Sequence, residues 1–119
     1  RYGSSEIEQI GQLMQLITAI IQPFMVDRLT RALRKAGFKH YTVDEAQGSS
    51  LVPNDPVHLQ ARMRIEVAVP DERSEELMEL ISVTVSTHQQ GDGVIYAMPI
   101  NRFVHIQSGL IDNKALTQS

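Results

Sequence analysis

One stretch of alternating residues decides the fold: Ala61-Arg62-Met63-Arg64-Ile65-Glu66-Val67-Ala68-Val69. Its odd-numbered positions are apolar, and its even-numbered positions are charged apart from Ala68. This period of two is typical of a β-strand with one buried face. The Pro70-Asp71 pair that follows is expected to end the strand.

Upstream of this stretch, the sequence predicts another strand and a helix. Leu13 to Ile21 is almost continuously apolar, which suits a strand buried on both faces, and Pro23 ends it. Asp27 is a plausible N-cap for the helix, and Gly37 is a natural end for it. The side of this helix turned away from its apolar residues is basic and carries Arg28, Arg31, Arg34 and Lys35. The simplest interpretation of that basic face is a solvated surface.

The remaining elements are predicted from shorter signals. Tyr41 to Ala46 favours a strand, and the stretch from Gly48 to Gln60 is rich in Gly, Ser, Pro, Asn and Asp, which favours a loop. Ser74 is a candidate N-cap for a second helix. Strands are then expected from Val94 to Met98 and, shorter, from Phe103 to Ile106.

The predicted order is strand, helix, strand, strand, helix, strand. Two strand–helix–strand halves give an α+β ferredoxin-like sandwich, one antiparallel sheet with both helices on one face. Because the first strand is apolar on both sides, we expect the open face to pack against other subunits in a closed oligomer.

Composition excludes several classes of function. The net charge of −3 argues against a nucleic-acid binder. With no cysteine, disulfides, thiol catalysis and Cys-based zinc sites are excluded. No apolar run is long enough to span a membrane, so a cytoplasmic location is expected. We expect residues 1–13 to be an extension or a cloning remnant, 14–111 to be the domain, and 112–119 to be a flexible tail.

Several stretches carry a resemblance to a known family. Leu16 to Phe24 resembles the first strand of the PII signalling proteins, and Ile65 to Asp71 resembles the strand and turn that open their second half. Gly91-Asp92-Gly93, followed by Ile95-Tyr96, resembles their phosphate loop and the strand after it. The ordered set spans Met14 to Gly109.

The resemblance implies a homotrimer with three nucleotide sites in the clefts between subunits. Such proteins bind ATP, ADP and small effectors, and present a long loop to a membrane transporter, a metabolic enzyme or a transcription regulator. By position, the counterparts of the purine pocket are Ile20, Thr42, Glu66 and Ala68. The counterparts of the phosphate loop are Gly91, Asp92 and Gly93, and Gly48 lies at the base of the long loop.

The chain also departs from the family pattern. Val94 and Gln22 stand where the family usually has lysines, and His105 and Gln107 stand where it usually has two arginines. The long loop is shortened between Gly48 and Arg62. Losing the basic groups at these positions weakens phosphate binding, since each charge-assisted hydrogen bond contributes about 1.5–3 kcal/mol. We therefore expect no required cofactor, poor binding of ATP, and better binding of AMP, ADP, a cyclic nucleotide or a small anion such as bicarbonate. Arg62 and protonated His105 are candidates to compensate in part.

Each of these residues also has a structural interpretation. The alternative for the Gly91–Gly93 turn is a plain helix-to-strand connection, and the alternative for His105 is a structural histidine, the usual role of a single histidine in a strand. Glu66 is as well explained by an ion pair with Arg64 or Arg62. For the loop, a plain hairpin connection competes with contact to a partner through Ser49, Ser50, Leu51, Val52 and Pro53.

Two other functions remain open from the sequence. One is a small enzyme of the ferredoxin-like dimeric-barrel type, for which only His105 is a candidate residue. The other is a metal-tolerance trimer of the CutA type, although the four histidines show no metal-ligand spacing. No catalytic triad or nucleophile motif can be assembled, so we expect a regulatory protein rather than an enzyme.

Overall fold

The computed structural model describes residues 13–49 and 59–107. Along the chain its elements are β1 (Met14–Ile21), the 3-10 turn η1 (Pro23–Met25), α2 (Val26–Lys35), β2 (Thr42–Ser49), β3 (Leu59–Pro70), the 3-10 turn η2 (Asp71–Arg73), α3 (Ser74–Val85) and β4 (Gly93–Ile100). The order of strands and helices is the one that the sequence predicts.

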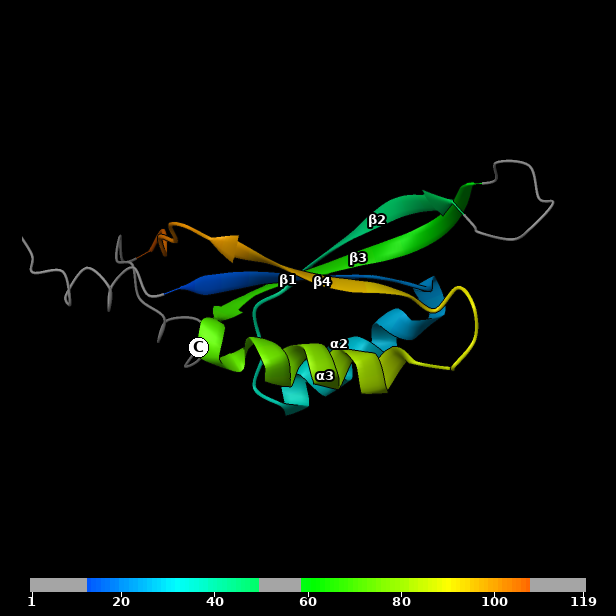
Figure 1. The fold of residues 1–119 in the computed structure, drawn as a ribbon, viewed down its shortest axis with the longest axis horizontal. Coiled ribbons are helices and arrows are strands. Elements are labelled where there is room, and N and C mark those ends of the chain that lie inside the picture. The colour runs from blue at the N-terminus through cyan, green and yellow to red at the C-terminus, as the bar shows by residue number, and fades with distance from the viewer. Residues whose placement is uncertain (1–12, 50–58, 108–119) are drawn as a thin grey trace, which may run out of the picture.

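The four strands form one antiparallel sheet in the order β2-β3-β1-β4 (Figure 1). β1 lies inside the sheet, where all of its residues pair with β3 on one side and with β4 on the other. Ile17, for example, lies between Val67 and Ala97. The predicted α+β ferredoxin-like fold is confirmed.

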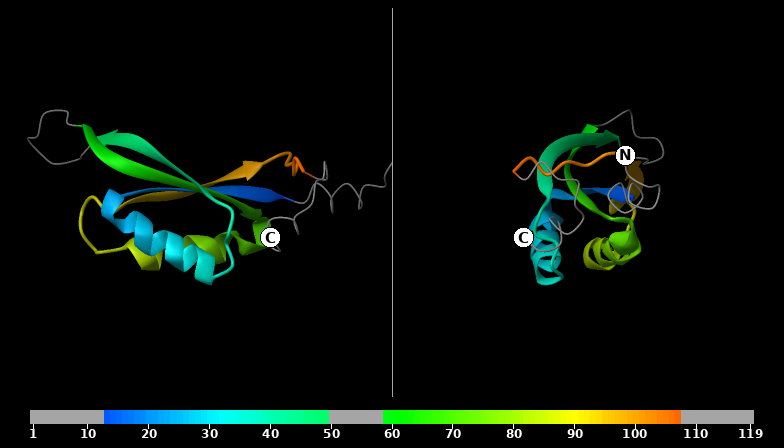
Figure 2. Two further views of the ribbon diagram at one scale, coloured as in Figure 1. Left: turned by 180° about the vertical axis from the view of Figure 1, so that it is seen from behind. Right: turned by 90° about the vertical axis from the view of Figure 1, so that its left-hand side faces the viewer.

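Both helices cover the same face of this sheet, side by side in one layer (Figures 1 and 2). The hydrophobic core lies between the helix layer and the sheet, because the odd-numbered residues of β1 and β3 point toward the helices. The buried core residues of these two strands and two helices are Ile17, Ala19, Ile21, Ile65, Val67, Val69, Leu29, Leu33, Leu77, Ile81 and Val85.

The even-numbered residues of β1 and β3 lie on the face that no helix covers. The strand register places Leu16 beside Ala68 and Met98, and Ile20 beside Arg64 and Val94. On this face Met14 and Thr18 are buried but Leu16 and Ile20 are only half-buried, so the expectation that the first strand is buried on both faces holds in part. Val94 and Met98 are 57% and 53% exposed, which leaves an apolar surface open on the edge strand.

The hairpin between β2 and β3 is longer than predicted. β2 continues to Ser49 and β3 begins at Leu59, so Gly48 pairs with Gln60 and both lie in strands rather than in the predicted loop. Cross-strand pairing outweighs the low β-propensity of Gly and Ser there. The paired strands extend beyond the helix layer at one end of the molecule (Figure 1).

The predicted short strand from Phe103 to Ile106 is wrong, because the structure has only an isolated bridge at His105 in that stretch. β4 ends at Ile100, whose partner Met14 is the first residue of β1. Beyond that pair, β1 offers no further strand residue to hydrogen-bond.

The two predicted N-caps are also wrong. Asp27 lies in the first turn of α2, whose N-cap is Met25, and Ser74 follows the α3 N-cap, Arg73. A 3-10 turn leads into each helix and starts it earlier than the side-chain signal indicates. The Ser74 hydroxyl instead donates to the Asp71 carbonyl at 2.8 Å.

The predicted boundaries of the domain cannot be compared with the structure, because nearly all of the 1–13 extension and all of the 112–119 tail lie outside the described residues. Among residues 13–49 and 59–107, no helix is both long enough and apolar enough to cross a bilayer.

Gly37 ends α2 as predicted, with a φ of 93°. The Gly37 N–H donates to the Arg34 carbonyl at 3.0 Å, and the Phe38 N–H donates to the Leu33 carbonyl at 2.8 Å. This pair of bonds is the Schellman arrangement, which satisfies two carbonyls at a helix end. Phe38, which is buried, then turns into the core.

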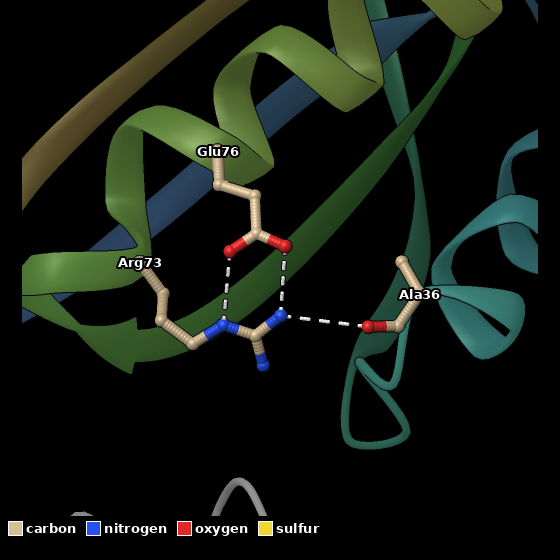
Figure 3. A network of polar contacts seen from close by, with 3 residues as sticks. All are labelled: Ala36, Arg73 and Glu76. Carbon is tan, nitrogen blue, oxygen red and sulfur yellow. Dashed lines mark hydrogen bonds and ion pairs between the residues drawn. The ribbon is translucent and has the colours of Figure 1, made fainter.

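Arg73 links the end of α2 to the start of α3 (Figure 3). Its guanidinium donates to both carboxylate oxygens of Glu76, at 3.1 and 2.9 Å, and to the Ala36 carbonyl at 3.4 Å. It also lies 4.1 Å from the centroid of the Phe38 ring. The hydrogen bond from Arg73 lowers the pKa of Glu76, with a smaller opposing effect of burial and a further lowering by the Arg73 charge. One side chain therefore joins the two strand–helix–strand halves.

Replacing Arg73 tests this link. Arg73→Ala removes a charge-assisted hydrogen-bond pair and a cation–π contact that are partly exposed, so the free energy of unfolding should fall by about 1–2 kcal/mol. The exposed Arg102→Ala serves as control and should change it by less than about 0.5 kcal/mol. Urea unfolding at one fixed protein concentration measures both, and equal effects of the two substitutions would contradict the role of Arg73.

Candidate functional site

A pocket of about 440 Å³ lies at the uncovered face, where β2 begins beside β3 and β1. It is lined by Leu16, Lys39, His40, Tyr41, Thr42, Glu66 and Ala68. Leu16 and Ala68 are adjacent cross-strand partners and provide an apolar floor. Thr42 and Glu66 are also cross-strand partners, so their polar groups lie at the same level of the sheet.

Glu66 lies in a polar row that crosses the sheet. Its neighbours in the row are Thr42 on β2, Thr18 on β1 and, beyond Thr18, Tyr96 on β4. The Thr18 hydroxyl is 3.4 Å from a Glu66 carboxylate oxygen and donates to it, and Thr18 is only 1% exposed. Thr18 therefore anchors the Glu66 carboxylate at the edge of the pocket, where it can accept a hydrogen bond from a ligand.

The alternative interpretation of Glu66 as half of an ion pair is wrong. Arg64 pairs with Asp44 at 3.1 Å. Arg62 donates to the Gln60 side chain at 2.8 Å and to the Ala61 carbonyl at 2.9 Å. Both arginines therefore have partners other than Glu66.

The pocket combines chemistry that suits a flat, partly polar ring. Leu16 and Ala68 offer an apolar surface, Thr42 and Tyr41 offer hydroxyls, and Glu66 offers an acceptor. Lys39 adds a positive charge at the rim. Ligand sites in proteins are usually such apolar hollows with a few polar groups at fixed positions.

Three of the four residues assigned to the purine pocket by position, Thr42, Glu66 and Ala68, line this one pocket. Ile20 lies on the same face but pairs with Arg64 and Val94, further along the strand, and does not line it. Sequence reasoning missed the Lys39-His40-Tyr41 segment. The only available signal was its position, a polar run directly before an edge strand.

The Gly91-Asp92-Gly93 turn joins α3 to β4 and requires glycine at both ends. Gly91 and Gly93 have φ values of 94° and 123°. A Cβ at Gly93 would lie 1.9 Å from the Ile20 carbonyl oxygen, whereas a Cβ at Gly91 would meet the Gln22 side-chain nitrogen at 3.5 Å. The start of β4 thus presses directly against β1.

The turn is fixed by two side chains. The Gln22 amide donates to the Gly91 carbonyl at 2.8 Å, across 69 residues of chain. The Asp92 carboxylate accepts from the Thr87 N–H at 2.7 Å, the Gln89 N–H at 3.3 Å and the Thr87 hydroxyl. These hydrogen bonds, the one from the Thr87 hydroxyl first, lower the pKa of Asp92. The Asp92 side chain therefore shapes its own loop.

The pocket and the turn lie apart within one chain. Gly93 pairs with Ile21, while Leu16 lies five residues back along β1, a separation of roughly 17 Å at the rise of a β-strand. A ligand of nucleotide size does not touch both from a single chain unless it spans that whole length.

The other predicted ligand residues lie elsewhere. Gly48 is inside β2, and Arg62 lines a second hollow of about 480 Å³ under the β2–β3 hairpin. His105 and Gln107 follow β4 at the end of the sheet opposite the Gly91 turn (Figure 1). Whether these residues touch a ligand stays a prediction.

Of the predicted partner loop, Ser49 is the last residue of β2. Ser50, Leu51, Val52 and Pro53 lie outside the described residues. Within the part of the chain that is described, no three His, Asp or Glu side chains are grouped to hold a metal ion.

Comparison with known proteins adds to this geometry. A family model described as nitrogen regulatory protein P-II matches residues 14–109. The chain belongs to the P-II family. The match covers every described strand and helix, the pocket and the Gly91 turn.

Relatives of this P-II protein are regulatory proteins. It is 31% identical over 112 residues to the nitrogen regulatory protein P-II of Rhizobium etli, with 87% of this chain and 100% of the relative covered. It is 32% identical over 105 residues to the P-II protein of Azospirillum brasilense, covering 81% and 94%. It is 29% identical over 112 residues to the nitrogen regulatory protein GlnK of Escherichia coli, covering 87% and 100%.

The comparison with GlnK of Escherichia coli gives information on the length of the loop between Gly48 and Arg62. Since 87% of 119 residues is about 104, about eight of the 112 aligned positions have no residue in this chain. A loop shortened between Gly48 and Arg62 agrees with a gap of that size.

Alanine substitutions at the two glycines of the turn should differ in cost. Gly91→Ala adds a side chain only at a positive φ, at a cost of about 1–2 kcal/mol. Gly93→Ala also forces β4 away from the Ile20 carbonyl, which adds roughly 1–3 kcal/mol. Urea unfolding of the two variants should therefore rank Gly93→Ala as clearly less stable. The opposite order would show that the close approach of β4 to β1 is wrong.

Asp92 should make stability depend on pH in the acid range. Its pKa is lowered by folding, so its stabilising effect is fully present above the ordinary pKa of an aspartate and is lost as pH falls through the lowered value. The melting temperature of Asp92→Asn should lie below that of the wild type at pH 7, and the two should converge under strongly acidic conditions. A difference that is the same at both pH values would contradict the carboxylate's role.

Proposed function

We propose that this P-II protein is a homotrimeric sensor that binds a small adenine nucleotide or a small anion between subunits and regulates a protein target. The observation that carries the proposal is the division of the site, with a pocket and a glycine turn on one chain roughly 17 Å apart along β1. A neighbouring copy supplies the missing half when its turn faces this chain's pocket.

The uncovered sheet face supports the trimer. Val94, Tyr96 and Met98 are exposed on β4 and lie in line with half-buried Leu16 and Ile20 on β1. Apart from the polar row at Thr18 and Tyr96, this surface is apolar, which favours contact with other copies. Closing three such faces around an axis covers this apolar surface and leaves a cleft at each boundary.

The chemistry of the two halves supports a ligand with little phosphate. The pocket offers Glu66 as acceptor and an apolar floor for a purine ring. At the turn, Val94 is apolar, and the neutral Gln22 amide already donates to the Gly91 carbonyl. Backbone N–H groups of a glycine turn bind one phosphate or a small anion, but a triphosphate needs cations as well. AMP, ADP, a cyclic nucleotide or bicarbonate therefore fit better than ATP.

The regulatory role rests on family membership and on the hairpin. The named relatives are nitrogen regulatory proteins, which favours a regulator of nitrogen or carbon status over the dimeric-barrel enzyme or the metal-tolerance trimer. The described strands of the β2–β3 hairpin, which end at Ser49 and begin again at Leu59, project past the helix layer (Figure 1). The 48–60 stretch is our candidate for contact with a membrane transporter or a metabolic enzyme in the cytoplasm.

Calorimetry on the purified protein tests the ligand preference. The wild type should bind AMP, ADP or bicarbonate more tightly than magnesium ATP. Val94→Lys, which places a cation beside the turn, should raise ATP affinity at least about tenfold, because a charge-assisted hydrogen bond contributes about 1.5–3 kcal/mol.

Val83→Lys is the matched control, since Val83 is equally apolar, 73% exposed and on the outer side of α3. It should leave ATP affinity unchanged. Tighter binding of ATP than of AMP by the wild type, or no gain in Val94→Lys, would refute the assigned chemistry of the turn. A monomer in solution scattering would refute the shared site.

A further inference from the structure

The outer side of α2 carries a dense positive charge that the proposed sensor does not use. Four cations, Arg28, Arg31, Arg34 and Lys35, are exposed there, and we refer to them as the basic stripe. They fall within about a third of the helix circumference at 100° per residue. The whole chain has a net charge of −3, so this helix is opposite in sign to the rest of the molecule.

No internal ion pair explains the basic stripe. Within residues 13–49 and 59–107, the ion pairs are Arg64 with Asp44 and Arg73 with Glu76. Asp27 lies one turn before Arg31, at a spacing that often gives an ion pair, and yet forms none with it. The charges of the stripe are therefore accessible to another molecule.

Helix stability does not explain the basic stripe either. Cations stabilise the last turn of a helix, which accounts for Arg34 and Lys35. Arg28 lies in the first turn of α2, where the helix dipole disfavours positive charge, and Arg31 lies in the middle of the helix, where the dipole does not stabilise it. Like charges three and four residues apart also repel each other, as do Arg28 with Arg31 and Arg31 with Lys35. The four cations of the stripe taken together therefore do not stabilise α2.

The width of the positive surface limits what can cover it. α3 lies beside α2 in the same layer and carries exposed Glu75 and Glu79 (Figure 2). Packed helices lie about 8–10 Å apart. A membrane or a nucleic-acid duplex is wider than that, so it would meet these carboxylates as well as the basic stripe. A single extended peptide fits on α2 alone.

We propose that the basic stripe of α2 is a docking surface for an extended acidic segment of a protein partner. The ten-residue helix is about 15 Å long, which an extended peptide of about five residues spans. Phe24, directly before the helix, is 72% exposed and offers an apolar contact at one end of the stripe. The same end carries Pro23, which lines the hollow under the β2–β3 hairpin. A partner that contacts the hairpin is therefore able to continue along α2.

This surface is independent of the ligand site, because α2 lies on the opposite face of the sheet from the pocket and the trimer contact. If the nucleotide experiments fail, the docking proposal is unaffected. If the docking experiments fail, the proposal of a ligand sensor is unaffected.

The test uses a fluorescein-labelled peptide of six glutamate residues and the full chain, measured by fluorescence anisotropy in about 20 mM and about 150 mM salt. The wild type should bind this peptide and not the matching peptide of six glutamines. Binding should weaken in the higher salt, because exposed charges are then screened. Arg31→Glu should weaken it at least tenfold.

Arg102→Glu is the matched control, with the same charge change at an exposed position outside the stripe, and it should alter affinity less than twofold. Arg31→Glu should melt at or above the wild-type temperature, since it relieves repulsion within α2, so a loss of binding does not reflect unfolding. Equal weakening by both substitutions would overturn the proposal, as would no binding by the wild type. Tighter binding to vesicles of phosphatidylserine or to duplex DNA than to the peptide would also overturn it.

Discussion

The fold depends on β1 being hydrogen-bonded along both of its edges while only one of its faces is covered. Pairing with β3 and β4 satisfies the backbone of β1 inside the sheet, and Ile17, Ala19 and Ile21 pack against the helices. The opposite side of the same strand, with Leu16 and Ile20, is left half-buried. The strand whose one side forms the core thus also carries, on its other side, an apolar surface that contact with another subunit would bury.

The sequence predicts well whatever follows from local periodicity. The alternation from Ala61 to Val69 and the apolar run to Ile21 place two inner strands, and Gly37 marks the end of α2. It predicts poorly whatever depends on pairing. Gly48 and Gln60 look like loop residues and become strand residues because each is the other's partner, while Phe103 to Ile106 has strand composition but forms only a single bridge, at His105.

The residues of the candidate site likewise fall into those that the sequence predicts and those that it does not. Family position brings Thr42, Glu66 and Ala68 to one pocket, because they lie on paired strands whose register the hydrophobic pattern fixes. Lys39, His40 and Tyr41 carry no pattern, and the bond from Gln22 to Gly91 spans a separation along the chain that no local signal reveals. At this turn, Gln22 and Asp92 hold the shape of the loop. If the turn binds a small anion as proposed, these two side chains already hold it in one shape before the anion arrives.

The distance between pocket and turn has a genetic consequence in a threefold assembly. Under the proposed shared site, each cleft takes its pocket from one copy and its glycine turn from the next. A copy with a damaged glycine turn therefore abolishes binding in the cleft that its neighbour's pocket forms, while its own pocket still binds with the turn of the other neighbour. In a cell that makes both intact and damaged chains, mixed trimers therefore retain some functional clefts. Two alleles, one damaged in the pocket and the other in the turn, restore a cleft wherever an intact pocket meets an intact turn.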